Sequence, residues 1–267
     1  MVQRREQARV SSERFAEFNL EGKVALVTGG GTGLGRQLAL ALGETGAHLM
    51  LVGRRTEPLE ETAAMIRTSA TIISGDLTDE RTVGRLVQYA SQVDILVNNA
   101  AIAPKTDWLQ QTLADFRQTM EINVLAPYRL CQVFAPAMAA RGWGRIVNIA
   151  SIYGSVGVDV RRYPKGFDVP AYVASKHALI GLTRYLACRL ADTGVTVNAL
   201  SPGMFPSRSR YTDVELHTLS EELSRATPMQ RVGGPDDLKA AIVFLASPGS
   251  KFVTGHNLVV DGGWTVW

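Results

Sequence analysis

The chain has 267 residues, of which 46% are hydrophobic and 20% are charged. This composition is typical of a globular protein and excludes disordered, collagen-like and disulfide-scaffold chains. The net charge of +3 comes from charges scattered along the chain, so the concentrated basic face that a nucleic acid requires is not expected. The length allows one large α/β domain or two smaller ones.

The first 18 residues are charged and contain no apolar core, which argues against a secretory signal. No run of 18 apolar residues occurs, so we expect no contact with a membrane. Cys131 and Cys188 lie far apart in apolar, helix-like stretches, which predicts neither a disulfide framework nor a metal site. These features favour a cytoplasmic protein.

The predicted elements alternate between strands and helices along the chain. Residues 1–19 are predicted to form a polar arm, and residues 20–267 show no linker or repeat that would divide them. Short apolar runs predict seven strands, at 24–27, 48–52, 71–74, 94–97, 145–149, 195–200 and 257–260. Apolar positions at helical spacing predict helices at 36–43, 57–67, 81–91, 113–141, 171–191 and 235–246. Because parallel strands need helical crossovers, this order predicts a single doubly wound parallel α/β sheet with helices on both faces.

Polar residues stand at the carboxyl ends of six of these strands, the edge where open α/β sheets bind ligands. They are Thr28, Arg54, Asp76, Asn98, Ser151 and Ser201. We therefore expect a ligand site along this edge.

The first strand is followed by a glycine-rich loop and then by a helix. Its sequence is Thr28-Gly29-Gly30-Gly31-Thr32-Gly33-Leu34-Gly35. Glycines let backbone N–H groups approach a pyrophosphate at the helix N-terminus, which predicts a dinucleotide ligand.

The end of the second strand indicates which dinucleotide is bound. An NAD site carries an acid there, but this chain has Gly53 followed by Arg54 and Arg55. Two guanidinium groups would pair with a 2′-phosphate, so NADP(H) is expected to be preferred, with NAD(H) possible. Asp76 and Leu77 follow the third strand, and the Asp76 carboxylate would accept from the adenine amine or cap a helix.

Tyr172 and Lys176 are four residues apart on a predicted helix, so both side chains lie on one face. A neighbouring ammonium favours the phenolate and lowers the pKa of a phenol. Tyr172 is therefore a candidate acid/base for a carbonyl or alcohol oxygen.

Taken together, the motifs resemble those of short-chain dehydrogenases/reductases, which have a Rossmann fold. The resemblance runs from residue 20 to the C-terminus and rests on the glycine loop, Asn98-Asn99-Ala100, Asn123, Ser151, Tyr172-x-x-x-Lys176, Pro202-Gly203 and Asp261-Gly262-Gly263. Within the family, the chain most resembles gluconate 5-dehydrogenases and sugar dehydrogenases.

The resemblance implies a role for each matching residue. Tyr172 would be the general acid/base, Lys176 would lower its pKa and bind the nicotinamide ribose, and Ser151 would polarise the substrate oxygen. Asn123 would hold a water of the proton relay. Further contacts to the cofactor would come from Asn99, Ala100, Pro202, Gly203, Met204 and Ser207.

Two segments near the expected substrate pocket depart from the family pattern. Tyr172 follows Ser151 by 21 positions, which is longer than usual and indicates an insertion. The cations in this insertion and in the expected substrate lid are Arg161, Arg162, Arg208 and Arg210. Because arginine binds carboxylates and phosphates through two parallel hydrogen bonds, they suggest a polar, anionic sugar or sugar acid. The alternative is that they are solvated surface charges.

Two other functions remain open at this point, a 3-oxoacyl thioester reductase and a catalytically silent scaffold that binds the cofactor. The resemblance also implies a homotetramer. Trp264 and Trp267 would then lie in a subunit interface or beside a neighbouring active site, with core packing as the alternative.

Overall fold

The computed structural model describes residues 16–160, 168–206 and 212–266. Seven parallel strands form one sheet in the order β3-β2-β1-β4-β5-β6-β7. Their bounds are β1 Val24–Thr28, β2 His48–Gly53, β3 Ala70–Ser74, β4 Ile95–Asn98, β5 Gly144–Ile149, β6 Val195–Pro202 and β7 Asn257–Val260. All seven predicted strands are present. The strand order reverses between β1 and β4, which is where open α/β sheets bind ligands.

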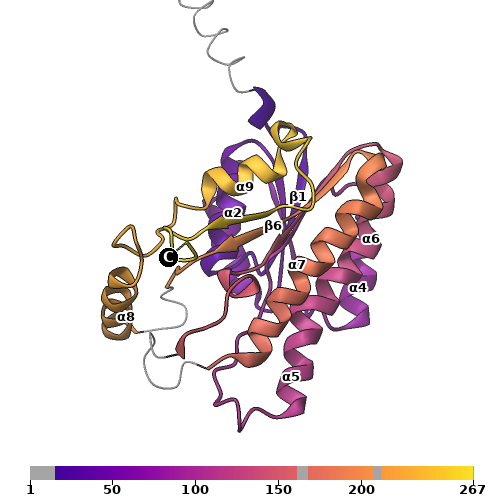
Figure 1. The fold of residues 1–267 in the computed structure, drawn as a ribbon. Coiled ribbons are helices and arrows are strands. Elements are labelled where there is room, and N and C mark those ends of the chain that lie inside the picture. Colours follow the sequence, from indigo (N-terminus) through magenta and orange to yellow (C-terminus); the bar gives the residue numbers. More distant parts are fainter. Residues whose placement is uncertain (1–15, 161–167, 207–211, 267) are drawn as a thin grey trace, which may run out of the picture.

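Helices cover both faces of the sheet (Figure 1). On one face lie α2 (Gly33–Glu44), α3 (Thr56–Met65) and α9 (Lys239–Ala246), which share a core that includes Leu38, Leu59 and Leu245. On the other face lie α4 (Glu80–Val87), α6 (Ala126–Ala140) and α7 (Pro170–Leu190), which share a second core that includes Phe134. The doubly wound α/β architecture is therefore confirmed.

The predicted helix 113–141 is divided into three parts. It consists of α5 (Leu113–Met120), a π-helical turn η2 (Glu121–Leu125) and α6. Single π turns within α-helices are frequently found at functional sites. This turn contains Asn123.

The helix α8 (Asp213–Arg225) was not predicted. Thr212 caps it by accepting from the backbone N–H of Glu215, whose side chain accepts in return from the Thr212 N–H. Figure 1 shows α8 standing apart from the two helical layers, beyond the carboxyl ends of the strands. The division at residue 19 stays a prediction, because residues 1–15 lie outside the described ranges.

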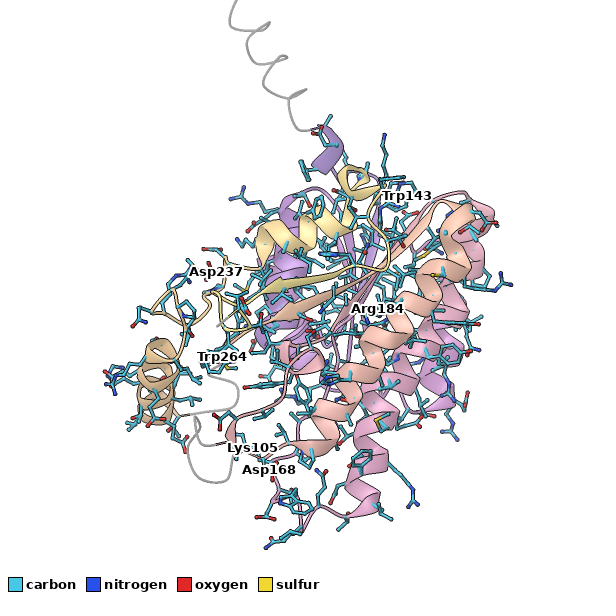
Figure 2. All side chains as sticks on the ribbon, in the orientation of Figure 1. Lys105, Trp143, Asp168, Arg184, Asp237 and Trp264 are labelled. Carbon is cyan, nitrogen blue, oxygen red and sulfur yellow. The ribbon has the colours of Figure 1, made fainter. Side chains whose placement is uncertain are left out.

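The side chains of the described residues pack around this framework (Figure 2). Cys131, on α6, is buried in the second core, whereas Cys188, on α7, is exposed. None of the described helices is long and apolar enough to cross a membrane.

Candidate active site

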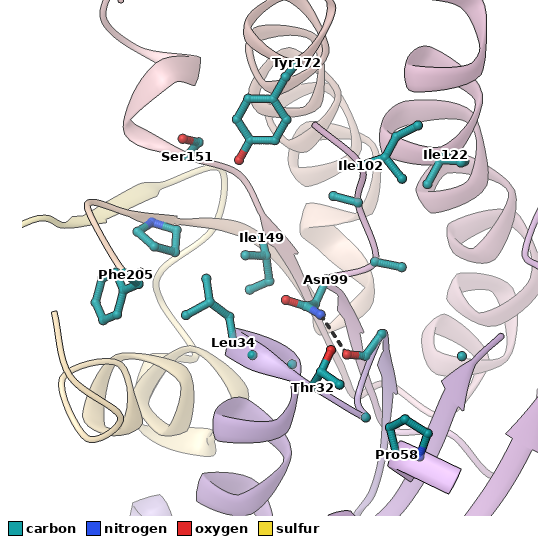
Figure 3. Close-up of a pocket in the computed structure, with 18 of the residues that line it drawn as sticks. Thr32, Leu34, Pro58, Asn99, Ile102, Ile122, Ile149, Ser151, Tyr172 and Phe205 are labelled. Atoms are coloured by element: carbon teal, nitrogen blue, oxygen red, sulfur yellow. Dashed lines mark hydrogen bonds between the residues drawn. The ribbon is translucent and has the colours of Figure 1, made fainter. Parts of the chain in front are cut away.

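A pocket of about 420 Å³ runs along the carboxyl edge of the sheet. Figure 3 shows its middle and one end, with Ser151 and Tyr172 on one side and the glycine loop on the other. The predicted site residues that line it are Gly29, Gly31, Thr32, Gly33, Leu34, Gly35, Arg54, Arg55, Asp76, Leu77, Asn99, Ala100, Ser151, Tyr172, Lys176, Pro202, Gly203 and Met204. The fold thus brings together residues that are up to 175 positions apart in the sequence.

The glycine loop is held tightly against the end of β4. The Asn99 side chain donates to the carbonyl oxygens of Thr28, at 2.8 Å, and of Gly29, at 3.3 Å. In return the Thr28 hydroxyl accepts from the backbone N–H groups of Asn99 and Ala100. A Cβ on Gly35 would overlap the carbonyl oxygen of Gly29, so no larger residue fits there.

The loop leads directly into α2, whose first residue is Gly33. Thr32 precedes this helix without capping it through its side chain, and Thr32, Gly33 and Leu34 all line the pocket. Free backbone N–H groups at a helix start attract phosphate. The middle of the pocket therefore fits the pyrophosphate of a dinucleotide.

Arg54, Arg55 and Asp76 lie together at one end of the pocket. The Asp76 carboxylate accepts from the Thr78 backbone N–H at 2.9 Å and from the Thr78 hydroxyl at 2.8 Å. These bonds, the backbone one first, and the charge of Arg54 hold the pKa of Asp76 below its usual value. The alternative role of Asp76 as a helix cap is wrong, because Asp79 caps α4.

Ser151, Tyr172 and Lys176 form the opposite end, where β5 and α7 meet. Lys176 is 2% exposed, and its Nζ donates to the carbonyl oxygen of Ile149 at 2.6 Å. The same Nζ lies 5.4 Å from the centre of the Tyr172 ring. The Ser151 hydroxyl accepts from the Tyr153 backbone N–H at 3.2 Å, and Ser151 lies on the same side of the pocket as Tyr172 (Figure 3).

Asn123 is buried behind this end of the pocket and does not line it. Its side-chain oxygen accepts from the Ile102 N–H at 2.9 Å, and its amide nitrogen donates to the Ile102 carbonyl at 2.9 Å and to the Ser175 hydroxyl at 3.0 Å. Ser175 in turn donates to the Tyr172 carbonyl at 2.7 Å. Asn123 therefore links a wall of the pocket to the helix that carries Tyr172.

The start of α7 is tied to the loop that precedes α5. The Gln111 side chain accepts from the Ala171 backbone N–H at 3.2 Å. Asp168 accepts from the backbone N–H groups of Thr106 and Trp108, through its carbonyl and its carboxylate. The first turn of α7, which carries Tyr172, is thus held by hydrogen bonds to the loop that precedes α5.

The outer wall of the pocket contains apolar residues that sequence analysis did not select. They are Phe205 and Pro206 after β6, and Leu219 and Leu223 on α8. The spacing of Leu216, Leu219 and Leu223 after a Thr-x-x-Glu capping signal would have predicted this helix.

Several predicted residues fall outside the described ranges. They are Ser207, Trp267 and the four arginines Arg161, Arg162, Arg208 and Arg210. Trp264 is 7% exposed and packs with Ile152, Tyr153 and Leu223, so within this chain it is a core residue. Among residues 16–160, 168–206 and 212–266, no group of three His, Cys, Asp or Glu side chains is arranged to hold a metal.

Comparison with known proteins agrees with this geometry. Residues 29–265 match the family model described as enoyl-(acyl carrier protein) reductase. Galactitol 2-dehydrogenase (L-tagatose-forming) of Cereibacter sphaeroides is 39% identical, over 94% of this chain and 98% of its own. A 3-oxoacyl-(acyl-carrier-protein) reductase of Rickettsia bellii is 35% identical, over 92% of this chain and 98% of its own.

A solved structure is similar over the same length. The gluconate 5-dehydrogenase from Burkholderia cenocepacia J2315, in complex with NADP and tartrate, has a TM-score of 0.83 and 32% identity, covering 94% of this chain and 98% of that one. The family match, these relatives and the fold agree. The chain belongs to the short-chain dehydrogenase/reductase family of oxidoreductases.

Proposed function

We propose that this protein uses NADP(H) to interconvert a secondary alcohol, or a hemiacetal hydroxyl, and a carbonyl on a polar, anionic sugar or sugar acid. The observation that carries the proposal is the pocket itself, which joins the glycine loop to Ser151, Tyr172 and Lys176. A bound nicotinamide dinucleotide supplies the hydride chemistry. The side chains of this pocket bind the substrate oxygen and move its proton.

Tyr172 is the proposed general acid/base. Its hydroxyl gives a proton to the substrate oxygen during reduction and takes one during oxidation. The buried ammonium of Lys176, fixed by the Ile149 carbonyl, favours the phenolate of Tyr172. The Ser151 hydroxyl orients and polarises the substrate oxygen, while Asn123 fixes the inner wall and holds the relay water that the family resemblance implies.

Cofactor preference is assigned to Arg54 and Arg55. They line the pocket end beyond the glycine loop, and Gly53 leaves no carboxylate at the end of β2 to repel a 2′-phosphate. The Burkholderia structure contains NADP, which supports the same choice. Asp76, kept ionised by Thr78, is the proposed acceptor for the adenine amine.

The substrate class is supported by the relatives and by the composition of the substrate loops. The names of two similar proteins describe dehydrogenases of galactitol and of gluconate. Arg161, Arg162, Arg208 and Arg210 are the proposed groups that bind the substrate's anionic end.

A second candidate function is reduction of a 3-oxoacyl thioester. The apolar outer wall of Met204, Phe205, Leu219 and Leu223 would suit an acyl chain, and the Rickettsia relative carries that name. Activity with an acetoacetyl thioester that exceeds activity with every sugar acid would favour this alternative.

We further propose a cytoplasmic homotetramer. Large apolar side chains are exposed on the helices α5 and α7 and on the turn between α5 and α6, among them Leu113, Leu125 and Tyr185. Burial of such side chains against another copy would be favourable. Light scattering of the purified protein would give the oligomeric mass, and a monomeric mass would contradict this assembly.

The proposed function is tested by a screen of polyols, aldoses, aldonic acids and phosphorylated sugars with both cofactors, following absorbance at 340 nm. We expect turnover with an aldonic acid or another anionic sugar and NADP+, and a kcat lower by about 10²-fold or more with the Tyr172→Phe variant. A variant that keeps more than about a tenth of the native kcat would refute the proposed chemistry.

A further inference from the structure

Arg36 lies on α2 behind the glycine loop and connects this loop to α3. Its Nη2 donates to the Gly31 carbonyl at 2.6 Å and its Nε to the same oxygen at 3.0 Å. On α3 the guanidinium contacts Thr62 Oγ1 at 3.0 Å, the Pro58 carbonyl at 3.4 Å and the Glu61 carboxylate at 2.6 Å.

Gly31 and the first turn of α3 approach each other closely at this point. A Cβ on Gly31 would lie 3.0 Å from Cβ of Pro58 and 3.1 Å from the Leu59 backbone nitrogen. Thr62 is fully buried, and its hydroxyl donates to the Pro58 carbonyl at 3.0 Å. The spacing between the glycine loop and α3 is therefore set by Gly31, which leaves room for α3, and by Arg36, which binds the Gly31 carbonyl and α3 at once.

The two parts that Arg36 joins are the two walls of the proposed 2′-phosphate site. Gly31 lines the pocket on one side, and Arg55, the residue that precedes α3, lines it on the other together with Pro58. Arg36 does not line the pocket, so its positive charge is not itself a phosphate contact.

The pairing with Glu61 also determines the charge near this site. With Arg36 in place, the carboxylate of Glu61 is neutralised by an ion pair. Without Arg36, the Glu61 carboxylate would stand unpaired on α3, the helix whose Pro58 and Leu59 line the pocket. NAD(H) has no 2′-phosphate, so this charge would weaken binding of NADP(H) selectively.

We propose that Arg36 is a positioning residue for cofactor selectivity: it fixes the distance between Gly31 and α3 and neutralises Glu61, which together favour NADP(H) over NAD(H). The inference rests on the proposed use of NADP(H). It assigns a role in selectivity to a residue that touches neither cofactor nor substrate.

The test is the dissociation constant of each oxidised dinucleotide, measured by calorimetry on the full chain without substrate. Arg36→Met removes the guanidinium and keeps a side chain of similar length. We expect the ratio of the Kd for NADP+ to the Kd for NAD+ to rise about three- to fivefold, because the Glu61 side chain is 56% exposed and an exposed ion-pair charge is worth less than a tenfold change. The variant Arg129→Met, which breaks the surface ion pair between α6 and Glu80, is the matched control and should leave the ratio unchanged.

Two further variants separate charge from geometry. Glu61→Gln removes the carboxylate and leaves Arg36 bound to the Gly31 carbonyl, so we expect the ratio to stay the same or to fall. The double variant Arg36→Met/Glu61→Gln has no unpaired carboxylate at position 61. The ratio of its two dissociation constants should therefore rise less than in Arg36→Met. If Arg36→Met does not fold, Arg36→Gln provides the same comparison, because it also removes the charge that neutralises Glu61.

A ratio within twofold of the native value in the folded Arg36 variant, or an equal loss of affinity for both dinucleotides, would overturn the inference. Those outcomes would leave the proposed function intact. A native protein that shows no preference for NADP+ would instead refute the proposed cofactor choice and, with it, this inference.

Discussion

Replacing Asn123 by Ala tests how the pocket is held together. The substitution removes three side-chain hydrogen bonds, two to the backbone of Ile102 and one to the Ser175 hydroxyl. Ser175 keeps its bond to the Tyr172 carbonyl, so the main loss falls on the half-buried N–H and C=O of Ile102. At about 1–3 kcal/mol for each polar group left without a partner, the free energy of unfolding should fall by about 2–4 kcal/mol.

The assay for Asn123→Ala is urea unfolding combined with turnover. We expect the midpoint to fall at an unchanged m-value, and kcat to fall because Ile102 lines the pocket and α7 carries Tyr172. Thr119→Val is the control, since this buried residue loses one hydrogen bond within α5 and should cost less than about 1 kcal/mol. A loss of stability below about 0.5 kcal/mol with native kcat for Asn123→Ala would refute the reasoning.

Three further outcomes are expected. Gly35→Ala should abolish dinucleotide binding in calorimetry, because the new Cβ overlaps a carbonyl oxygen of the glycine loop; native affinity would contradict the loop geometry. Burial raises the pKa of the Cys131 thiol to about 12, so at pH 8 mass spectrometry should find iodoacetamide on the exposed Cys188 alone, and on both cysteines in urea. Gln111→Leu removes the acceptor for the Ala171 N–H and should lower kcat with little change in cofactor affinity, whereas Gln111→Glu should retain more activity; equal activity of the two variants would argue against this contact.

The strands were predictable because each contains a short apolar run, and β1, β2, β4, β5 and β6 are buried along nearly their whole length, whereas β3 and β7 are only partly buried. Nearly every residue of Val24–Thr28 and Val195–Pro202 is buried. The polar residues at the ends of these strands mark the edge of the sheet where the ligand site lies. The glycine loop and the pair Tyr172 and Lys176 were predictable for another reason: each is a motif of residues at short, fixed spacing along the chain.

The π-helical turn at Asn123 could not be predicted in this way. It depends on hydrogen bonds to Ile102 and Ser175, which lie 21 and 52 positions away. Local spacing likewise could not decide between Asp76 and Asp79 as the cap of α4, because both precede the helix and only the geometry of the turn separates them. The hydrogen bonds of the Arg36 and Gln111 side chains also join segments that are distant in the sequence.

The central claim is that Tyr172 moves the proton of the substrate oxygen. Its most direct test is turnover of the Tyr172→Phe variant with NADP+ and the best substrate of the 340 nm screen, together with the Kd for NADP+. The account predicts a fall in kcat of about 10²-fold or more, since a general acid/base contributes about 10²–10⁴-fold, with a Kd within about threefold of the native value because the ring and Lys176 remain. A variant that binds NADP+ normally and keeps more than about a tenth of the native kcat would contradict it.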